Sequence, residues 1–338
     1  MSQELTNLES LRNALHGAMA DDPSVVVFGE DILDPYGGAF KVTKGLSTAF
    51  PNRVFTTPIC EGAIVGMANG LALRGMRPVA ELMFGDFITL AADQLINHAA
   101  KFPAMYNGAV ALPLVVRTPM GGGRGYGPTH SQSLERMFCG VPHLTIVAPT
   151  LFHDAGKMLR TAIASDGPVL FIENKLLYPL RQQRSSANGI HHEILDPEAE
   201  YPTVRLRNFG DAGAPDVTLI ANGGVSRFLP SLLERLCHEE IRLQAVLPGS
   251  LSPLPATALL AAAAADSGRV VIAEEGIATN GWGAELATRL YESCMGKLAC
   301  PILRLGALPT VIPAAKHLED EILLSETTIL NAILKVLS

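Results

Sequence analysis

The chain has 338 residues, of which 48% are hydrophobic and 17% are charged, so it can form two domains of ordinary size with buried cores. Its formal net charge is -7 and its Lys and Arg residues form no cluster interleaved with aromatic residues, which argues against a nucleic-acid partner. The longest apolar runs, near 64–73 and 259–265, are too short to span a bilayer, so we also expect no membrane association.

The cysteines and the first residues bear on the compartment. The five cysteines are odd in number and widely spaced, and none forms a Cys-x-x-Cys pair, which predicts reduced thiols rather than a zinc or redox site. The first residues lack a basic segment followed by an apolar one, so we expect no secretory signal and a cytoplasmic location.

Short apolar strands alternate with helices through the first half of the chain. Apolar residues at helical spacing predict a helix over 5–20. Strands are predicted at 24–28, 78–83, 112–117, 144–148 and 169–172, with helices over 91–101 and 153–164 between some of them. This alternation predicts a parallel sheet covered by helices on both faces.

The alternation stops at a polar segment and then restarts. We interpret 184–214 as a linker that could hold one hairpin, and His191-His192 within it as solvated surface rather than metal ligands. Further strands are predicted at 217–221, 243–247, 270–273 and 301–305, and the chain ends in an amphipathic helix over 328–337. The fold class is therefore α/β with two doubly wound domains, 1–183 and 215–338.

One carboxylate, Glu61, is predicted at the start of an apolar helix. Pro58 ends the preceding segment, and glycines then recur every fourth residue at 62, 66 and 70. Such spacing removes side chains from one helix face, so that another backbone can approach closely. Glu61 alone could equally be an ordinary first-turn acid, because a negative charge is favoured there.

Two further segments could carry chemistry. A glycine-rich loop over 121–132 follows a strand and contains His130, a side chain suited to proton transfer near neutral pH or an incidental surface histidine. Its glycine spacing matches neither a P-loop nor a dinucleotide site. Met83 and Phe87, at the end of another strand, could line a site for a flat aromatic ligand or belong to the core.

Several motifs together resemble one enzyme family. They are Gly29-Glu30-Asp31, Thr57-Pro58-Ile59-Cys60-Glu61, Gly75-Met76-Arg77-Pro78, the stretch 93–101 and His130-Ser131-Gln132. They resemble the beta subunit of the thiamine-diphosphate-dependent, decarboxylating component of 2-oxo acid dehydrogenase complexes, such as pyruvate, branched-chain 2-oxo acid and acetoin dehydrogenases. The resemblance covers nearly the whole chain and is strongest to about Tyr178. It implies a transketolase-like pyrimidine-binding domain followed by a transketolase C-terminal domain.

The resemblance also implies roles for individual residues. Glu61 would hydrogen-bond the aminopyrimidine ring nitrogen of thiamine diphosphate, Met83 and Phe87 would line the pocket for that ring, and His130 would assist acyl transfer to a lipoyl group. Five residues would form a structural potassium site: Leu114, Ala162, Ile163, Ser165 and Gly167. At the last two positions the family more commonly has Asp and Asn.

The cofactor site implied by the resemblance is incomplete in this chain. Thiamine diphosphate enzymes hold magnesium through a Gly-Asp-Gly motif, which this sequence lacks. We therefore expect an alpha subunit that holds magnesium, in an alpha2beta2 heterotetramer, with the glycine face of residues 62, 66 and 70 suited to the interface. The expected activity is decarboxylation of a 2-oxo acid, with the acyl group passed to the lipoyl domain of an acyltransferase.

The second domain departs from the family pattern. Residues 246–254 replace the more usual Asp-Leu-Arg before Ser-Pro-Leu, in a domain that helps the family dock its acyltransferase core. Two alternatives therefore stay open: a subunit of a stand-alone acyloin-forming or transketolase-like synthase, and a non-catalytic partner chain.

Overall fold

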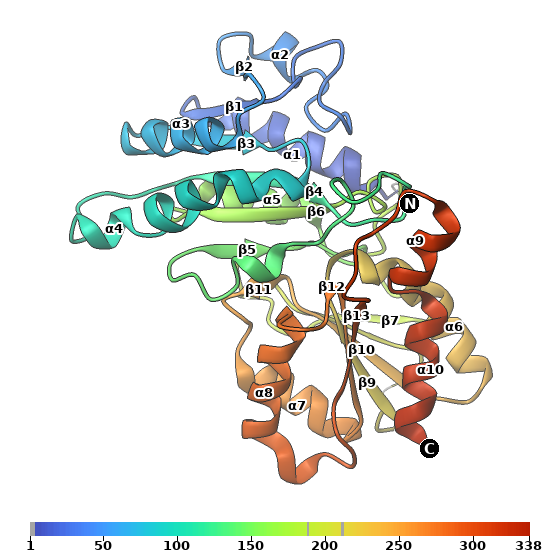
Figure 1. The fold of residues 1–338 in the computed structure, drawn as a ribbon. Coiled ribbons are helices and arrows are strands. Elements are labelled where there is room, and N and C mark those ends of the chain that lie inside the picture. The colour runs from blue at the N-terminus through green and yellow to red at the C-terminus, as the bar shows by residue number, and fades with distance from the viewer. Residues whose placement is uncertain (1–3, 188, 211–212) are drawn as a thin grey trace. The chain divides into compact units, whose positions relative to one another are not determined.

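The computed structural model describes residues 4–187, 189–210 and 213–338, which form two compact units (Figure 1). The first unit comprises the described residues up to Met120 together with Met137–Pro149 and Asp154–Gln182. The second comprises Gly121–Arg136, Thr150–His153 and the described residues from Gln183 to Ser338. The glycine-rich loop with His130 therefore belongs to the second unit.

The first unit is built on a parallel sheet with the strand order β5-β6-β4-β3-β1-β2. Its strands are β1 (Val25–Gly29), β2 (Val54–Thr56), β3 (Arg77–Glu81), β4 (Val115–Met120), β5 (Thr145–Val147) and β6 (Val169–Asn174). Its α-helices are α1 (Asn7–Asp21), α2 (Leu46–Ala49), α3 (Glu61–Leu73), α4 (Phe102–Met105) and α5 (Ala155–Ala164). A 3-10 helix η1 (Gly85–Ala91) and a π-helix η2 (Gln94–Ala99) follow β3, and η3 (Glu135–Met137) is a 3-10 turn.

Local sequence signals account for the first two elements. Thr6 and Glu9 form a capping box at the start of α1, in which Thr6 Oγ1 accepts from the Glu9 N–H at 3.2 Å and Glu9 Oε2 accepts from the Thr6 N–H at 2.9 Å. Every residue of β1 is buried, as expected for a parallel strand covered on both faces. At its end, a Cβ on Gly29 would lie 2.4 Å from the carbonyl oxygen of Glu81, so only glycine allows β1 and β3 to approach this closely.

The second unit contains a mixed sheet with the order β13-β12-β9-β10-β8-β7, in which β8 and β7 are antiparallel to their neighbours. Its strands are β7 (His191–Ile194), β8 (Val204–Arg207), β9 (Val217–Ala221), β10 (Leu243–Leu247), β11 (Ser250–Ser252), β12 (Val270–Ile277) and β13 (Leu303–Ala307). Figure 1 shows α7 (Thr257–Ser267) and α8 (Trp282–Cys294) on one side of this sheet, and α6 (Leu229–His238) and α10 (Glu326–Leu337) on the other. The remaining helices are η4 (Gly223–Phe228), η5 (Met295–Lys297) and α9 (Lys316–Ile322).

The prediction of two α/β domains with doubly wound sheets is confirmed, but three local predictions need correction. Strand β4 begins at Val115 rather than at 112, because Pro113 has no N–H to contribute to the ladder. The helix predicted over 91–101 is a π-helix over Gln94–Ala99, where the Asn69 side chain donates to the Gln94 carbonyl at 3.0 Å. The segment 184–214 does hold the one hairpin that was expected, β7–β8, but it is more than a linker, because β8 joins the second sheet through β10.

No helix among the described residues is both long and apolar enough to cross a bilayer.

Candidate active site

Glu61 lies where the sequence predicts it, as the first residue of α3. Its side chain is buried, and the residue is 3% exposed. The preceding Cys60 gives no side-chain cap to the helix, so the first turn is left with a carboxylate and free N–H groups. Within the described residues, the Glu61 carboxylate has no hydrogen-bond partner.

Two more buried oxygen atoms at this edge of the first sheet make no hydrogen bond within the described residues. Glu30 directly follows β1 and is 3% exposed, and its Oε1 makes no hydrogen bond. The Thr57 N–H donates to the Gly29 carbonyl at 3.0 Å, which brings Thr57 to the end of β1, and its buried Oγ1 also lacks a partner. Buried polar atoms are rarely left unpaired in native proteins, so this group requires a polar partner from outside the described residues.

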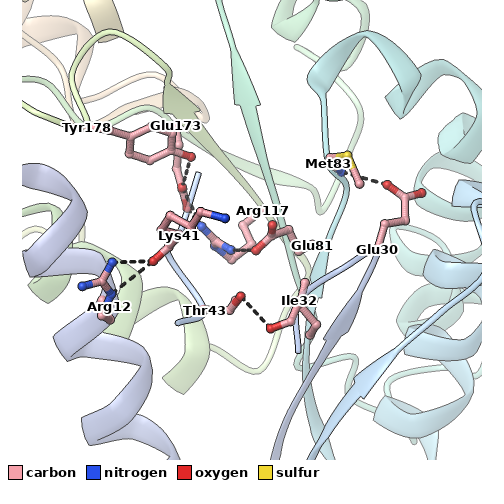
Figure 2. A network of polar contacts seen from close by, with 10 residues as sticks. All are labelled: Arg12, Glu30, Ile32, Lys41, Thr43, Glu81, Met83, Arg117, Glu173 and Tyr178. Atoms are coloured by element: carbon pink, nitrogen blue, oxygen red, sulfur yellow. Dashed lines mark hydrogen bonds and ion pairs between the residues drawn. The ribbon is translucent and has the colours of Figure 1, made fainter. Parts of the chain in front are cut away.

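The two glutamates interact electrostatically. Burial is the main factor that raises the pKa of Glu30 to about 7, and the nearby charge of Glu61 raises it further. A hydrogen bond from the Met83 N–H to Glu30 Oε2, at 3.3 Å, acts in the opposite direction (Figure 2). Glu30 can therefore gain or lose a proton near neutral pH beside Glu61, as acid–base groups in active sites do.

Met83 lies beside Glu30, and Phe87 lies four residues later in the chain, within η1. Met83 directly contacts Glu30 through its N–H, and its side chain is half-buried. Phe87 is half-buried in η1, which packs closely on α3, since a Cβ on Gly62 would lie 3.1 Å from the Leu90 carbonyl oxygen. Half-buried apolar side chains beside buried carboxylates are typical of a ligand pocket.

The glycine face of α3 contacts this chain more than the sequence predicts. Gly62 faces Leu90, and a Cβ on Gly66 would lie 3.2 Å from the Gln94 side chain, whereas nothing lies within 4 Å of one on Gly70. The close backbone approach expected from the glycine spacing is thus made within the first unit, by η1 and η2. Only the Gly70 end of the face is open, so the expectation that all three glycines serve a subunit interface needs correction.

A buried ion network joins three strands of the first sheet. Arg117 on β4 is 1% exposed; its Nη1 pairs with Glu81 on β3, and its Nη2 donates to Glu173 Oε2 on β6 at 2.6 Å (Figure 2). The Tyr178 hydroxyl donates to the same Glu173 oxygen at 2.6 Å. Burial raises the pKa of Tyr178 well above its usual value, with the Glu173 charge adding to the shift. The network ties β3, β4 and β6 together next to Met83.

The sequence reasoning missed Glu30 and Arg117 as site residues, although each left a signal. Glu30 is an acid placed directly after a fully buried strand, the position where functional groups gather in doubly wound folds. Arg117 is a single charge within the apolar run of β4, and a buried charge is tolerated only with a partner.

His130 lies in the loop of the second unit. The ring Nδ1 of His130 is 2.9 Å from the Thr129 hydroxyl, and the backbone N–H of His130 donates to the Gly127 carbonyl at 3.4 Å. The residue is half-buried. Glu61 and Met83 belong to the first unit and His130 to the second.

The carbonyl groups expected to bind potassium already face a cation of the chain itself. Arg77 Nη1 donates to the Ile163 carbonyl at 3.1 Å and to the Ser165 carbonyl at 2.9 Å. The Leu114 carbonyl accepts from the Val169 N–H at 2.8 Å. The positive charge of Arg77 lies within hydrogen-bond distance of two of the five carbonyl oxygens, so it would repel a potassium ion bound to them. These five residues therefore do not fit a potassium site. Among the described residues, no group of three or more His, Cys, Asp or Glu side chains is placed to hold a metal ion.

Two family models match the chain. One is described as the transketolase pyrimidine binding domain and matches residues 3–181, and the other is the transketolase C-terminal domain and matches residues 211–329. A split-gene transketolase solved as an inactive beta4 tetramer has the same fold, with a TM-score of 0.71 and 20% identity over 99% of this chain and 98% of that chain.

Relatives with higher identity share nearly the full length. The 3-methyl-2-oxobutanoate dehydrogenase subunit beta of Mycobacterium tuberculosis is 36% identical over 94% of this chain and 87% of that protein. The mitochondrial pyruvate dehydrogenase E1 component subunit beta-1 of Arabidopsis thaliana is 33% identical over 94% of this chain and 85% of that protein. The acetoin:2,6-dichlorophenolindophenol oxidoreductase subunit beta of Cupriavidus necator is 32% identical over 95% of this chain and 94% of that protein.

Proposed function

This chain belongs to the family of 2-oxo acid dehydrogenase beta subunits, and from that membership we propose that it forms half of a thiamine-diphosphate site that decarboxylates a 2-oxo acid and passes the acyl group to a lipoyl domain. The observation that carries this proposal is the group of buried, unpartnered oxygens at the carboxyl end of β1. Glu30 Oε1 and Thr57 Oγ1 lack hydrogen bonds, and the Glu61 carboxylate beside them is buried. A polar heterocycle with ring and amino nitrogens fits that group.

Each residue of the proposal has a role that its chemistry permits. Bound thiamine diphosphate supplies the carbon nucleophile and the electron sink for decarboxylation. Glu61 would hydrogen-bond the ring nitrogen of the aminopyrimidine and share a proton with it, in a buried site where little water competes. Met83 and Phe87 give the ring an apolar wall. His130 exchanges a proton with the acyl acceptor.

The proposal includes a partner chain. This sequence lacks the Gly-Asp-Gly magnesium motif, and no metal-binding cluster lies among the described residues. We therefore assign the magnesium and the diphosphate to an alpha subunit, in an alpha2beta2 assembly. Turnover should require both chains, and transfer of the acyl group should require a lipoyl acyltransferase.

Substitution of Glu61 in the reconstituted complex tests the catalytic role. Glu61→Gln keeps the size of the side chain but cannot exchange a proton, so decarboxylation should fall by a factor on the order of 10² to 10⁴. Glu198→Gln, which removes an exposed carboxylate, is the control and should be unchanged. Full turnover by the Glu61 variant would instead favour a non-catalytic partner chain.

The identity of the acceptor is tested with the same complex. A lipoylated domain should be acylated during turnover, whereas free aldehydes should accept little of the product. Efficient condensation with an aldehyde and no acylation of the lipoyl domain would favour the stand-alone synthase instead.

A further inference from the structure

We propose that Glu319 is a positioning residue, which fixes the loop that carries His130 and thereby supports acyl transfer. We call residues 121–130 the His130 loop. The inference rests on the proposed role of His130 and adds a residue that neither the motifs nor the family resemblance indicated.

The contacts are specific to this carboxylate. Glu319 lies on α9 and is 0% exposed. Its Oε1 accepts from the Gly123 N–H at 2.8 Å, and its Oε2 accepts from the Gly125 N–H at 3.0 Å. Each oxygen thus holds a different amide of the loop. Hydrogen bonds to an ionised acceptor are about twice as strong as neutral ones.

The backbone of the loop is shaped for these contacts. Gly123 has φ 90° and Gly125 has φ 69°, which is the left-handed region that other residues rarely adopt. A Cβ on Gly122 would lie 2.6 Å from Leu323 Cδ1, and one on Gly125 would lie 3.1 Å from the Ala314 carbonyl oxygen. The loop therefore lies directly on α9 and the residues before it, and its glycines permit that approach.

No cation accounts for the burial of Glu319. Among the described residues, its carboxylate forms no ion pair with Lys, Arg or His, so the two loop amides are what stabilise its charge. Removing the carboxylate leaves both amides without their acceptor, and the loop loses its attachment to α9. A change to Gln is more selective, because it replaces one acceptor oxygen by an NH₂ group that cannot accept.

The fixed loop leads into a cavity. Pro128 and the residues 131–134 line a cavity of about 410 Å³ in the second unit, together with Glu275 and the residues 307–312. His130 lies between Pro128 and Ser131 on the same stretch of chain. Glu319 thus fixes the stretch of chain that carries His130 and leads to the residues lining this cavity.

Trypsin provides a direct readout of loop attachment in the full-length chain. Arg124 lies between the two bonded amides, so cleavage of the Arg124–Gly125 bond, identified by mass spectrometry, reports how often the loop detaches. Glu319→Gln should raise that cleavage rate about tenfold, because it removes a hydrogen bond to a charged group. Glu321→Gln, which changes an exposed carboxylate on the same helix, is the matched control and should leave the rate unchanged.

The activity readout separates positioning from general damage. In the reconstituted complex, Glu319→Gln should retain decarboxylation coupled to a dye acceptor and lose at least tenfold in acylation of a lipoyl domain. Retained dye-coupled turnover shows that the variant is folded. His130→Ala tests the proposed function independently, since it should lose acyl transfer without faster cleavage after Arg124.

Two results would overturn the inference. One is an unchanged cleavage rate after Arg124 in Glu319→Gln and also in Glu319→Ala. The other is full acyl transfer by Glu319→Gln in a complex where His130→Ala abolishes it. Full acyl transfer by His130→Ala would instead refute the proposed role of His130, and loop attachment would still be measured by the cleavage rate.

Discussion

Glu30 and Glu61 are two buried carboxyl groups close enough to affect each other. Such a pair cannot easily carry two negative charges, so one member keeps its proton at a higher pH than usual. The raised pKa of Glu30, about 7, makes it the protonated member at mildly acidic pH. The pair therefore offers a ligand both a donor and an acceptor, which suits a heterocycle with ring and amino nitrogens.

Glu30 should make the stability of the chain depend on pH. Its pKa is about 7 in the folded chain, above the ordinary 4.5, so the folded state holds the proton more tightly than the unfolded state. The stabilisation is fully present below about pH 4.5 and is lost as pH rises through 7. Glu30→Gln mimics the protonated form, so it should be more stable than the unchanged chain at pH 8 and show a flatter dependence between pH 5 and 8.

Urea unfolding of the full-length chain across this pH range measures the effect. Glu198→Gln, an exposed change, should keep the pH profile of the unchanged chain. A Glu30→Gln variant with the same pH dependence as the unchanged chain would show that Glu30 titrates normally.

At the scale of residues, the sequence predicts single site residues better than it predicts which residues contact one another. Glu61 is recognisable because Pro58 and the glycines mark the start of its helix. Its interaction with Glu30 depends on β1 and α3 meeting in space, 31 positions apart in the chain, and no local pattern encodes that distance. No local pattern predicts the contacts of Arg77 either, since it donates to the carbonyl of Ile163, near the end of α5, and to that of Ser165, directly after α5.

Among the elements, the strands of the first sheet are held together by buried charge as well as by apolar packing. Removing Arg117 would leave Glu81 and Glu173 buried without the guanidinium that pairs with both. Breaking a buried ion pair from one side usually costs about 3–5 kcal/mol. We therefore expect Arg117→Met to lower the free energy of unfolding by about that amount.

An exposed ion pair in the same unit provides the control. Arg160 pairs with Asp21 at 2.6 Å, and their side chains are 45% and 66% exposed. Arg160→Met should change the free energy of unfolding by less than about 1 kcal/mol. Equal losses for the two variants in chemical unfolding would show that the Arg117 network contributes no more than a surface pair.

Arg77 makes a prediction about potassium. Because its guanidinium already binds the Ile163 and Ser165 carbonyls, potassium should not stabilise the chain beyond sodium. The midpoint of thermal unfolding should be the same in KCl and NaCl at equal ionic strength. A midpoint several degrees higher in KCl alone would show that the ion binds in spite of Arg77.

The element predictions succeeded where burial alone decides the structure. Runs such as 25–29 and 217–221 are apolar on both faces and form central strands, as predicted. The errors arise where side chains or backbone chemistry intervene, as at Pro113 before β4 and at the Asn69 contact with η2. The hairpin β7–β8 was allowed for in the sequence, but its place in the second sheet was not predicted, because three of the four residues of β7 are His or Glu and its burial is incomplete.

On the scale of the whole molecule, the central claim is that this chain is half of an enzyme. On the proposed function, it would provide a carboxylate pair, an apolar wall and a loop histidine, whereas its sequence lacks the Gly-Asp-Gly motif for magnesium. Charged phosphate groups contribute much of the affinity for a cofactor of this kind through their metal. If, as proposed, the chain contacts only the aminopyrimidine, it should bind the cofactor far more weakly than the assembled pair.

Calorimetric titration of thiamine diphosphate in the presence of magnesium measures this directly. The account predicts no measurable heat, or affinity at least about 100-fold weaker, for the full-length chain alone than for the chain combined with an alpha subunit, a difference of about 2.7 kcal/mol. Tight, magnesium-dependent binding by the isolated chain would contradict it.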